Sequence, residues 1–213
     1  MTLSPAGLKE RGEQPPGFLG VACVAVDRPA VHFIYDHVGV RFHNFLSATT
    51  HLAKAAHWLA AACLAYAAIW AWLRWIGENG PIRLASQVAL AFLASLALGS
   101  AVLHGTKLVL GRRRPRDELE MNRYGFIWFG FNLDWNSFPS GHALTIMCVA
   151  TIATALWPGL AILWFAIALW LGLTRALLNA HFLSDVFVGA GIGLVSAREA
   201  LVNFFPQLTP LWF

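Results

Sequence analysis

The sequence predicts an all-α, polytopic membrane helix bundle with about five transmembrane helices and an N-terminal interfacial helix. Three observations lead to this fold class. Hydrophobic residues make up 58% of the 213-residue chain, only 12% of its residues are charged, and its mean hydropathy is +0.59. These values lie outside the usual range for soluble globular domains. The apolar residues also gather in stretches of about 20 residues, the length that a helix needs to cross the hydrocarbon core.

Five predicted spans follow one another from the middle of the chain to its carboxyl end. They cover Trp58 to Ile76, Leu84 to Leu103, Pro139 to Trp157, Leu160 to Leu178 and Val186 to Phe205. The turn at residues 157–159, Trp-Pro-Gly, reverses the chain between the third and fourth spans. In the last span, Gly189, Gly191 and Gly193 form a small-residue surface that permits close helix packing. Residues 51–213 are therefore predicted to be one transmembrane domain.

The first 50 residues are predicted to form a separate amino-terminal part. Residues 1–17 contain Pro, Gly, Lys and Glu without apolar periodicity, which suits a mobile tail. The apolar run from Phe18 to Val26 is too short to span the membrane, and the basic residues Lys9 and Arg11 before it also fit a degenerate signal sequence. Residues 30–50 mix apolar side chains with His, Asp and Arg, which suits an amphipathic helix in the membrane interface.

The formal net charge of +4 does not indicate nucleic acid, because the basic residues collect in one string, GRRRPR at residues 111–116. Phosphate groups and lipid headgroups are the better partners for such a string near a membrane. Histidines are scattered at positions 32, 37, 43, 51, 57 and 104 without Cys, Asp or Glu at ligand spacing. We interpret them as interfacial or helix-capping residues and expect no metal and no cofactor.

A lysine and an arginine–proline pair follow the second span. Lys107 and Arg114 are seven residues apart, so on one helix they would share a face about 10 Å apart along the axis. Pro115 disfavours the helical conformation for Arg114, and the helix is predicted to end there. The second span would then deliver both cations to the membrane surface. Ordinary juxtamembrane charges would look the same, so this string alone does not identify a site.

A second polar string, Pro139 to His142, opens the third span. Proline is favourable in a first helical turn, and the free N–H groups of a helix start can bind an anion. Gly141 lets a phosphate approach the backbone closely, and Ser140 can add a hydroxyl donor. A capped helix start with a chance histidine is the alternative, which the position of this string just after the first one makes less favourable.

A third polar string, Arg175 to Asp185, joins the last two spans. His181 and Asp185 are spaced i, i+4 and would share a helix face. Asn179, a poor helix-interior residue, is predicted to mark a break that lets Arg175 and His181 converge. Ionisable residues at membrane depth are functional candidates, although a structural ion pair is the simpler alternative.

Together the strings read K-x6-RP, PSGH and R-x5-H-x3-D, in that order. This arrangement resembles the type 2 phosphatidic acid phosphatase (PAP2) family over about residues 86–202. The resemblance implies a membrane enzyme that binds a phosphate group and hydrolyses it through a phosphohistidine without a metal. The third motif of the family usually opens with Ser-Arg and here reads Thr174-Arg175, and we expect the threonine hydroxyl to preserve phosphate binding.

The resemblance also implies a role for each matching residue. His181 is the nucleophile, Asp185 fixes its tautomer and stabilises the cation that forms, and His142 donates a proton to the departing lipid alkoxide. The remaining residues cradle the non-bridging oxygens of the phosphate: Lys107, Arg114, Ser140, Gly141 and Arg175. Topology favours this site, because alternating spans bring all three strings to one membrane face.

The predicted function is hydrolysis of a lipid phosphate, with phosphatidic acid, phosphatidylglycerol phosphate, lipid A phosphate and polyprenyl pyrophosphate as candidate substrates. A lipid phosphotransferase and a non-catalytic lipid-phosphate binding or transport protein are the alternatives. Haloperoxidases hold vanadate in similar pockets, but they are soluble proteins, so five predicted membrane helices argue against that role here.

We expect a bacterial inner membrane location. The positive-inside rule places the active face in the cytoplasm, whereas members of the family commonly face the periplasm or lumen. The sequence predicts no oligomeric state.

The segment at residues 124–135, between the first two strings, is dense in aromatic residues. Aromatic rings favour the headgroup level of a membrane. The segment is therefore predicted to lie on the bilayer, where it either guides an amphiphilic substrate to the site or acts as an anchor.

Overall fold

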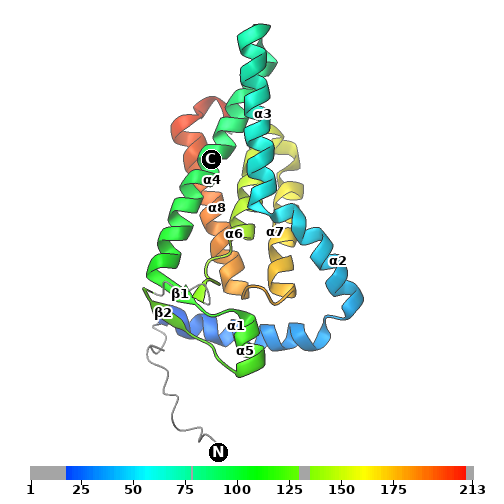
Figure 1. Ribbon diagram of the computed structural model, residues 1–213, viewed down its shortest axis with the longest axis vertical. Helices are drawn as coiled ribbons and strands as arrows, with labels where there is room; N and C mark the ends of the chain where they lie inside the picture. The colour runs from blue at the N-terminus through cyan, green and yellow to red at the C-terminus, as the bar shows by residue number, and fades with distance from the viewer. Residues whose placement is uncertain (1–17, 78, 130–134, 210–213) are drawn as a thin grey trace, which may run out of the picture.

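A computed structural model of the chain describes residues 18–77, 79–129 and 135–209 (Figure 1). This part of the chain is mostly helical, so the predicted all-α membrane bundle is confirmed. The predicted tail at residues 1–17 and the middle of the aromatic segment lie outside the described residues. The helices are α1 (Phe18–His37), α2 (Val40–Thr50), α3 (Ala55–Trp75), α4 (Gly80–Val109), α5 (Pro115–Met121), α6 (Gly141–Leu156), α7 (Ala161–Leu177) and α8 (Leu183–Phe204). Short 3-10 turns occur at His51–Ala53, Pro158–Leu160 and Pro206–Leu208, and the strands are β1 (Leu110–Arg112) and β2 (Phe126–Trp128).

The five predicted spans fall on α3, α4, α6, α7 and α8, one span to each helix. In the described chain, three segments are long and apolar enough to cross a membrane: Val40–Trp75, Gly80–Val109 and Pro158–Leu177. The first of them joins α2 to α3. Helix α6 is apolar but has 16 residues, which is about 24 Å of helix. With such helices the protein is an integral membrane protein.

Helix α4 begins and ends with clear local signals. The side chain of Asn79 caps its first turn by accepting a hydrogen bond of 3.0 Å from the Ile82 amide, and a proline in that turn favours a helix start. The helix ends at Val109. The prediction that one helix carries Lys107 and continues to Arg114 is therefore wrong.

The chain leaves the helix because β1 pairs with β2 in an antiparallel arrangement, with Gly111 opposite Ile127. A Cβ at Gly111 would lie 3.0 Å from side-chain atoms of both Ile127 and Trp135. Glycine is also a poor helix former. Both its low helix propensity and this close packing favour the strand.

Helices α6 and α8 form the centre of the bundle and approach each other closely. A Cβ on Gly189 would stand 2.3 Å from the carbonyl oxygen of Ser140, and a Cβ on Gly193 would stand 2.3 Å from that of Leu144. The predicted small-residue surface is confirmed at these two positions. Gly191 has nothing within 4 Å of its would-be Cβ and does not contribute. The close approach holds the start of α8 against the start of α6.

The amino-terminal helices lie at one end of the bundle. Figure 1 shows α1 crossing this end, with α5 beside it, and α2 leading back up to α3. Helices α1 and α2 expose several large apolar side chains, among them Phe33, Tyr35, Val40 and Phe45. Exposed apolar groups on helices that also carry charged residues suit the membrane interface. The apolar run that begins at Phe18 belongs to a helix that continues to His37.

Candidate active site

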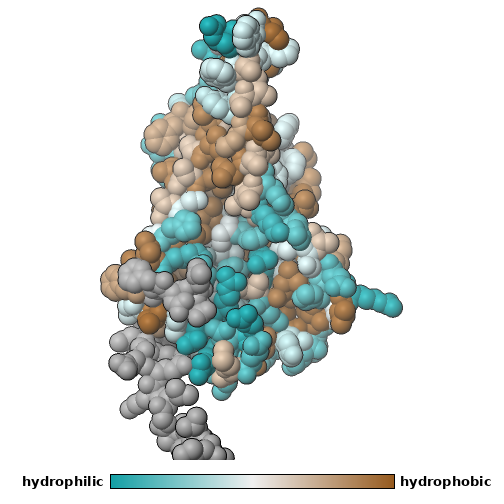
Figure 2. Space-filling view, in the orientation of Figure 1, coloured by the Kyte–Doolittle hydropathy of each residue, from teal (hydrophilic) through white to brown (hydrophobic). Residues whose placement is uncertain are grey.

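The three polar strings meet at one end of the bundle, where α4 and α7 end and α6 and α8 begin (Figure 1). Figure 2 shows hydrophilic residues gathered towards this end, while hydrophobic residues dominate the middle of the bundle. The site therefore lies outside the apolar middle of the bundle. The alternating direction of successive spans predicted that the three polar strings would meet at one end.

The first string contributes cations from two different elements. Lys107, in the last turn of α4, donates hydrogen bonds of 2.6 and 3.0 Å from its ammonium group to the side-chain and backbone oxygens of Asn136. Arg114 lies in extended backbone at the N-cap of α5, as expected before Pro115. Its charge acts on both Lys107 and Arg175, so the three cations lie close together although they come from separate segments.

The second string forms the start of α6. Ser140 is the N-cap residue and is fully buried, and its amide donates to the backbone oxygen of Asp185 at 3.0 Å. Gly141 is the first residue of the helix, where amide groups lack partners within the helix. Among the described residues, neither the hydroxyl of Ser140 nor Nε2 of His142 has a hydrogen-bond partner, although both atoms are buried. These polar atoms fit a phosphate.

The third string forms the turn between α7 and α8. Asn179 has a positive φ of 50°, and the amides of Ala180 and His181 both donate to the Arg175 carbonyl at 3.0 and 3.1 Å. The predicted break at Asn179, which brings Arg175 and His181 together, is confirmed. His181 lies before α8, so the prediction that His181 and Asp185 share a helix is wrong, although the two side chains do meet.

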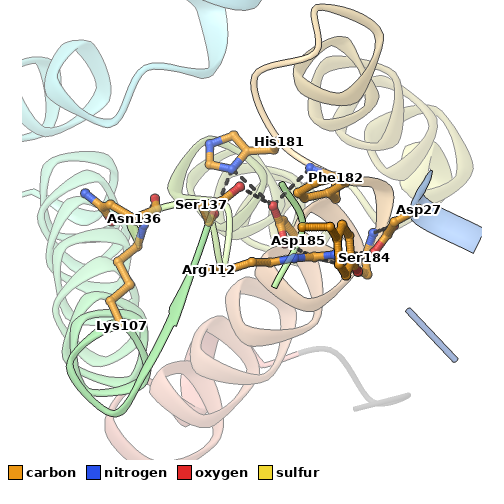
Figure 3. A network of polar contacts seen from close by, with 10 residues as sticks. Asp27, Lys107, Arg112, Asn136, Ser137, His181, Phe182, Ser184 and Asp185 are labelled. Atoms are coloured by element: carbon orange, nitrogen blue, oxygen red, sulfur yellow. Dashed lines mark hydrogen bonds and ion pairs between the residues drawn. The ribbon is translucent and has the colours of Figure 1, made fainter. Parts of the chain in front are cut away.

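His181 is oriented mainly by a carbonyl group (Figure 3). Its Nδ1 lies 2.8 Å from the backbone oxygen of Ser137 and 3.6 Å from Oδ2 of Asp185. A carbonyl oxygen only accepts hydrogen bonds, so Nδ1 carries the proton and donates a hydrogen bond to the Ser137 carbonyl. The neutral ring then has its lone pair on Nε2. The sequence predicted that Asp185 fixes this tautomer, but the shorter contact is with Ser137.

Asp185 is completely buried and fully engaged. Oδ2 accepts hydrogen bonds from the Ser137 hydroxyl at 2.6 Å and from the Phe182 amide at 2.9 Å. Oδ1 accepts from the guanidinium of Arg112. Asp185 therefore holds the Ser137 segment and the start of α8 in one arrangement, and it supports His181 through both.

Sequence reasoning missed a second buried carboxylate behind Asp185. Arg112 also donates to Oδ2 of Asp27, on α1, at 2.6 Å. Asp27 accepts further bonds from Ser184, at 3.0 Å from its amide and 2.5 Å from its hydroxyl. An aspartate directly after an apolar run was the available signal, because a buried carboxylate needs a partner. The basic string was noticed as a whole, without separating Arg112 from its neighbours.

The charges of the site follow from burial and from these partners. Burial lowers the pKa of His181, the hydrogen bond and charge of Asp185 oppose this shift, and Arg175 and Lys107 lower the pKa further. His181 is therefore neutral at pH 7, as a nucleophile must be. Burial opposes the charge of Arg112, but Asp185, Tyr124 and Asp27 together raise the pKa of its guanidinium. Arg112 remains charged.

Thr174 uses its hydroxyl in contacts with other protein groups. Its buried hydroxyl donates to the Leu171 carbonyl at 2.6 Å and lies 3.0 Å from the hydroxyl of Thr50. Thr50 in turn lies 3.4 Å from Nη1 of Arg175. The threonine therefore joins α7 to α2 and reaches Arg175 through Thr50.

The described residues of the aromatic segment take two different roles. Trp128 and Phe129 are exposed. In contrast, the central guanidinium carbon of Arg113 lies 4.2 Å from the ring centroid of Trp135, and the Tyr124 hydroxyl accepts a hydrogen bond from Arg112.

No group of three or more His, Cys, Asp or Glu side chains in the described chain could hold a metal ion.

Comparisons with known proteins place this geometry in a family. Residues 88–208, more than half of the chain, match the PAP2 superfamily. Two lipid A 1-phosphatases, from Rhizobium etli and Rhizobium johnstonii, are 33% and 34% identical over 104 and 87 residues. These alignments cover 48% and 41% of this chain and 45% and 36% of the relatives. The chain thus spans less than half the length of the curated relatives it matches.

Two solved structures share the fold. Aquifex aeolicus LpxE has a TM-score of 0.59 at 19% identity, over 83% of this chain and 95% of that chain. A transmembrane PAP2-type phosphatidylglycerolphosphate phosphatase from Bacillus subtilis has a TM-score of 0.59 at 20% identity, over 89% of each chain. The superfamily match contains all three polar strings and confirms the family that they predicted. This chain belongs to the PAP2 superfamily.

Proposed function

We propose that this protein is a membrane lipid phosphatase that works through a phosphohistidine at His181. The observation that carries the proposal is the contact that orients the ring of His181. Its Nδ1 is held by the Ser137 carbonyl, which leaves the lone pair on Nε2. Three buried groups without a partner in the described chain, the hydroxyl of Ser140, Nε2 of His142 and Nε of Arg175, support a phosphate site beside it.

The proposed reaction has two steps. In the first, Nε2 of His181 attacks phosphorus, an N–P bond forms, and the P–O bond to the lipid breaks. Lys107, Arg114 and Arg175 stabilise the charge of the phosphoryl oxygens. The negative phosphate favours protonation of His142, which gives its proton to the departing oxygen. In the second step a water loses a proton to His142 and cleaves the N–P bond, and inorganic phosphate leaves.

The names of the curated relatives make a lipid A 1-phosphate the first substrate to test. A cavity of about 510 Å³ at the active end could hold the part of a substrate that lies beyond its phosphate. Its walls come from α1, α2, α5 and the end of α7, and they include Tyr35, His43, Leu119 and Asn179. This volume is typical of small-molecule sites. Phosphatidic acid has no headgroup part to place in such a cavity.

Filling the cavity should therefore impair large-headgroup substrates selectively. We expect Leu119→Trp to lower kcat/KM for lipid A 1-phosphate about tenfold, which corresponds to a loss of about 1.4 kcal/mol of binding free energy, and to leave phosphatidic acid turnover near the wild-type value. Met121→Trp is the matched control, because Met121 lies on the same helix, is exposed and does not line the cavity. Equal effects of both substitutions on both lipids would exclude a role of the cavity in substrate choice.

The aromatic segment gives a second prediction. Trp128 is 58% exposed, and we expect Trp128→Ala to lower turnover of a lipid phosphate several-fold while a short soluble phosphate ester is cleaved normally, because the ring would act at the bilayer surface. Trp75→Ala, at an 85% exposed position on α3, should affect neither substrate. If Trp128→Ala slowed both substrates equally, the segment would have no guiding role.

The function is tested by measuring phosphate release from the detergent-purified protein in EDTA across the four candidate lipids. Release by the wild type would support a metal-independent phosphatase and rank its substrates. Lipid phosphorylation without free phosphate would instead support a phosphotransferase. If neither product formed, the result would support a binding or transport protein.

A bacterial inner membrane remains the proposed location. A reporter at the carboxyl end, after α8 has returned to the opposite end of the bundle, would identify the side of the active site.

A further inference from the structure

Helix α1 places a buried carboxylate at the base of the active site. Asp27 has no exposed surface, although it comes from the amino-terminal helix and not from the motif segments. Its two oxygens accept hydrogen bonds from Arg112 and from the amide and hydroxyl of Ser184. Burial of a charge is costly unless the charge is paired and hydrogen-bonded. These contacts explain how Asp27 stays buried, and they connect α1 to α8.

Arg112 joins Asp27 to Asp185. Its side chain is also fully buried, and separate nitrogens of one guanidinium contact the two carboxylates, Nη2 for Asp27 and Nη1 for Asp185. The rings of Phe182, Phe126 and Tyr124 surround the group, with centroids 4.0, 4.7 and 5.1 Å from its central carbon. A planar, enclosed guanidinium has little rotational freedom. Arg112 therefore fixes the distance and orientation between the two carboxylates.

The connection continues to the nucleophile. Oδ2 of Asp185, the oxygen not used by Arg112, holds the Ser137 hydroxyl and lies 3.6 Å from Nδ1 of His181. Figure 3 shows Asp185 between the guanidinium of Arg112 and the ring of His181, with Asp27 next to Ser184. Arg112 thus contacts Asp185 from the side away from His181. Arg112 is buried, whereas Arg114 and Arg175 are partly exposed.

We propose that Asp27 and Arg112 are positioning residues for the Asp185–His181 pair, so that helix α1 is part of the catalytic machinery. This inference rests on the proposed phosphatase function. Asp27 anchors Arg112, Arg112 anchors Asp185, and Asp185 with Ser137 holds His181 for attack. The chain of charges also balances the site, because two carboxylates and one guanidinium leave one net negative charge to stabilise the imidazolium character that His181 gains on forming the N–P bond.

The charge balance distinguishes this role from simple packing. His181 must be neutral to attack, so kcat/KM falls at acid pH with a midpoint that follows its pKa. The charged or titratable groups that face His181 are Asp185, Arg175, Lys107 and His142. Arg112→Gln removes a positive charge behind Asp185 and should raise the pKa of His181, which moves the acid limb to higher pH. Asp27→Asn removes a negative charge and should move it to lower pH.

The experiment measures kcat/KM against pH for the full-length wild type, Arg112→Gln, Asp27→Asn and Ser184→Ala, all with one lipid phosphate, so that ionisation of the substrate is common to all. We expect opposite shifts of about half a pH unit or more for the two charge variants, since a single charge acts across several Å of partly buried protein. Ser184→Ala, which removes hydrogen bonds from the same network without changing its charge, should lower the rate and leave the acid limb in place.

Two results would overturn the proposal: full activity in both charge variants, or lower rates in both with an unmoved acid limb. If Arg112→Gln does not fold, Asp27→Asn and Arg112→Lys carry the test, because the lysine variant keeps the charge and loses the fork. Arg112→Lys should lower kcat without moving the acid limb. A wild type that releases no phosphate from any lipid would contradict the proposed function itself, which is a different outcome from unshifted variants of an active enzyme.

Discussion

His181→Asn and His181→Ala are expected to release essentially no phosphate from any lipid substrate. Losing one phosphate-binding donor typically costs about 10² to 10³ in rate, and losing the nucleophile removes the covalent route entirely. We therefore expect a loss of more than about 10³ in kcat. Asparagine is the stricter test, because its side-chain amide can still donate to the Ser137 carbonyl that now accepts from Nδ1. The measurement is phosphate release by purified protein in EDTA.

A second histidine provides the control for this experiment. His104 is exposed on α4 and does not belong to the site, so His104→Ala should retain turnover near the wild-type value. Normal turnover by a folded His181→Asn protein would contradict the phosphohistidine mechanism, and a loss shared by His104→Ala would show that the assay reports general damage.

The second large effect is expected where α8 touches α6. In both Gly189→Ala and Gly193→Ala, the new Cβ would stand 2.3 Å from a backbone carbonyl oxygen, a distance that the two helices can relieve only by moving apart. Overpacking of a core usually costs about 1–3 kcal/mol, and a clash with backbone belongs at the upper end. We expect each substitution to lower the Tm of the detergent-purified protein by about 10 °C.

Gly191→Ala is the matched control, since nothing lies within 4 Å of the new methyl group. It should leave Tm unchanged or slightly higher, because alanine favours the helix more than glycine does. Gly189→Ala should also lower activity among the molecules that fold, since Ser140 begins α6 at that contact. Similar Tm values for all three variants would show that the helices are not closely packed here.

Local signals predicted much of the fold. Continuous apolar stretches located α3, α4, α6, α7 and α8, because length and hydropathy decide which segments can cross a membrane. The break in the helix at Asn179, where φ is 50°, was predicted from the poor helix propensity of asparagine. The meeting of the three polar strings followed from the alternating direction of successive helices, which requires no knowledge of side-chain packing.

Other parts of the site depend on contacts that no local pattern contains. Arg112 and Asp27 are 85 residues apart, and their pairing follows from how α1 crosses the end of the bundle. The early end of α4 depends on the pairing of Gly111 with Ile127 in a two-stranded sheet. The Ser137 carbonyl that orients His181 is a backbone group, and side-chain identity gives no sign of it.

The most direct test of the account is to quench the full-length wild-type enzyme during turnover of a lipid labelled in its phosphate, under alkaline conditions that preserve phosphohistidine, and to map the label by mass spectrometry. The mechanism predicts a label on His181 that forms and decays at the rate of turnover and is absent from His181→Asn. Rapid release of phosphate with no labelled residue, or with the label on another residue, would contradict it.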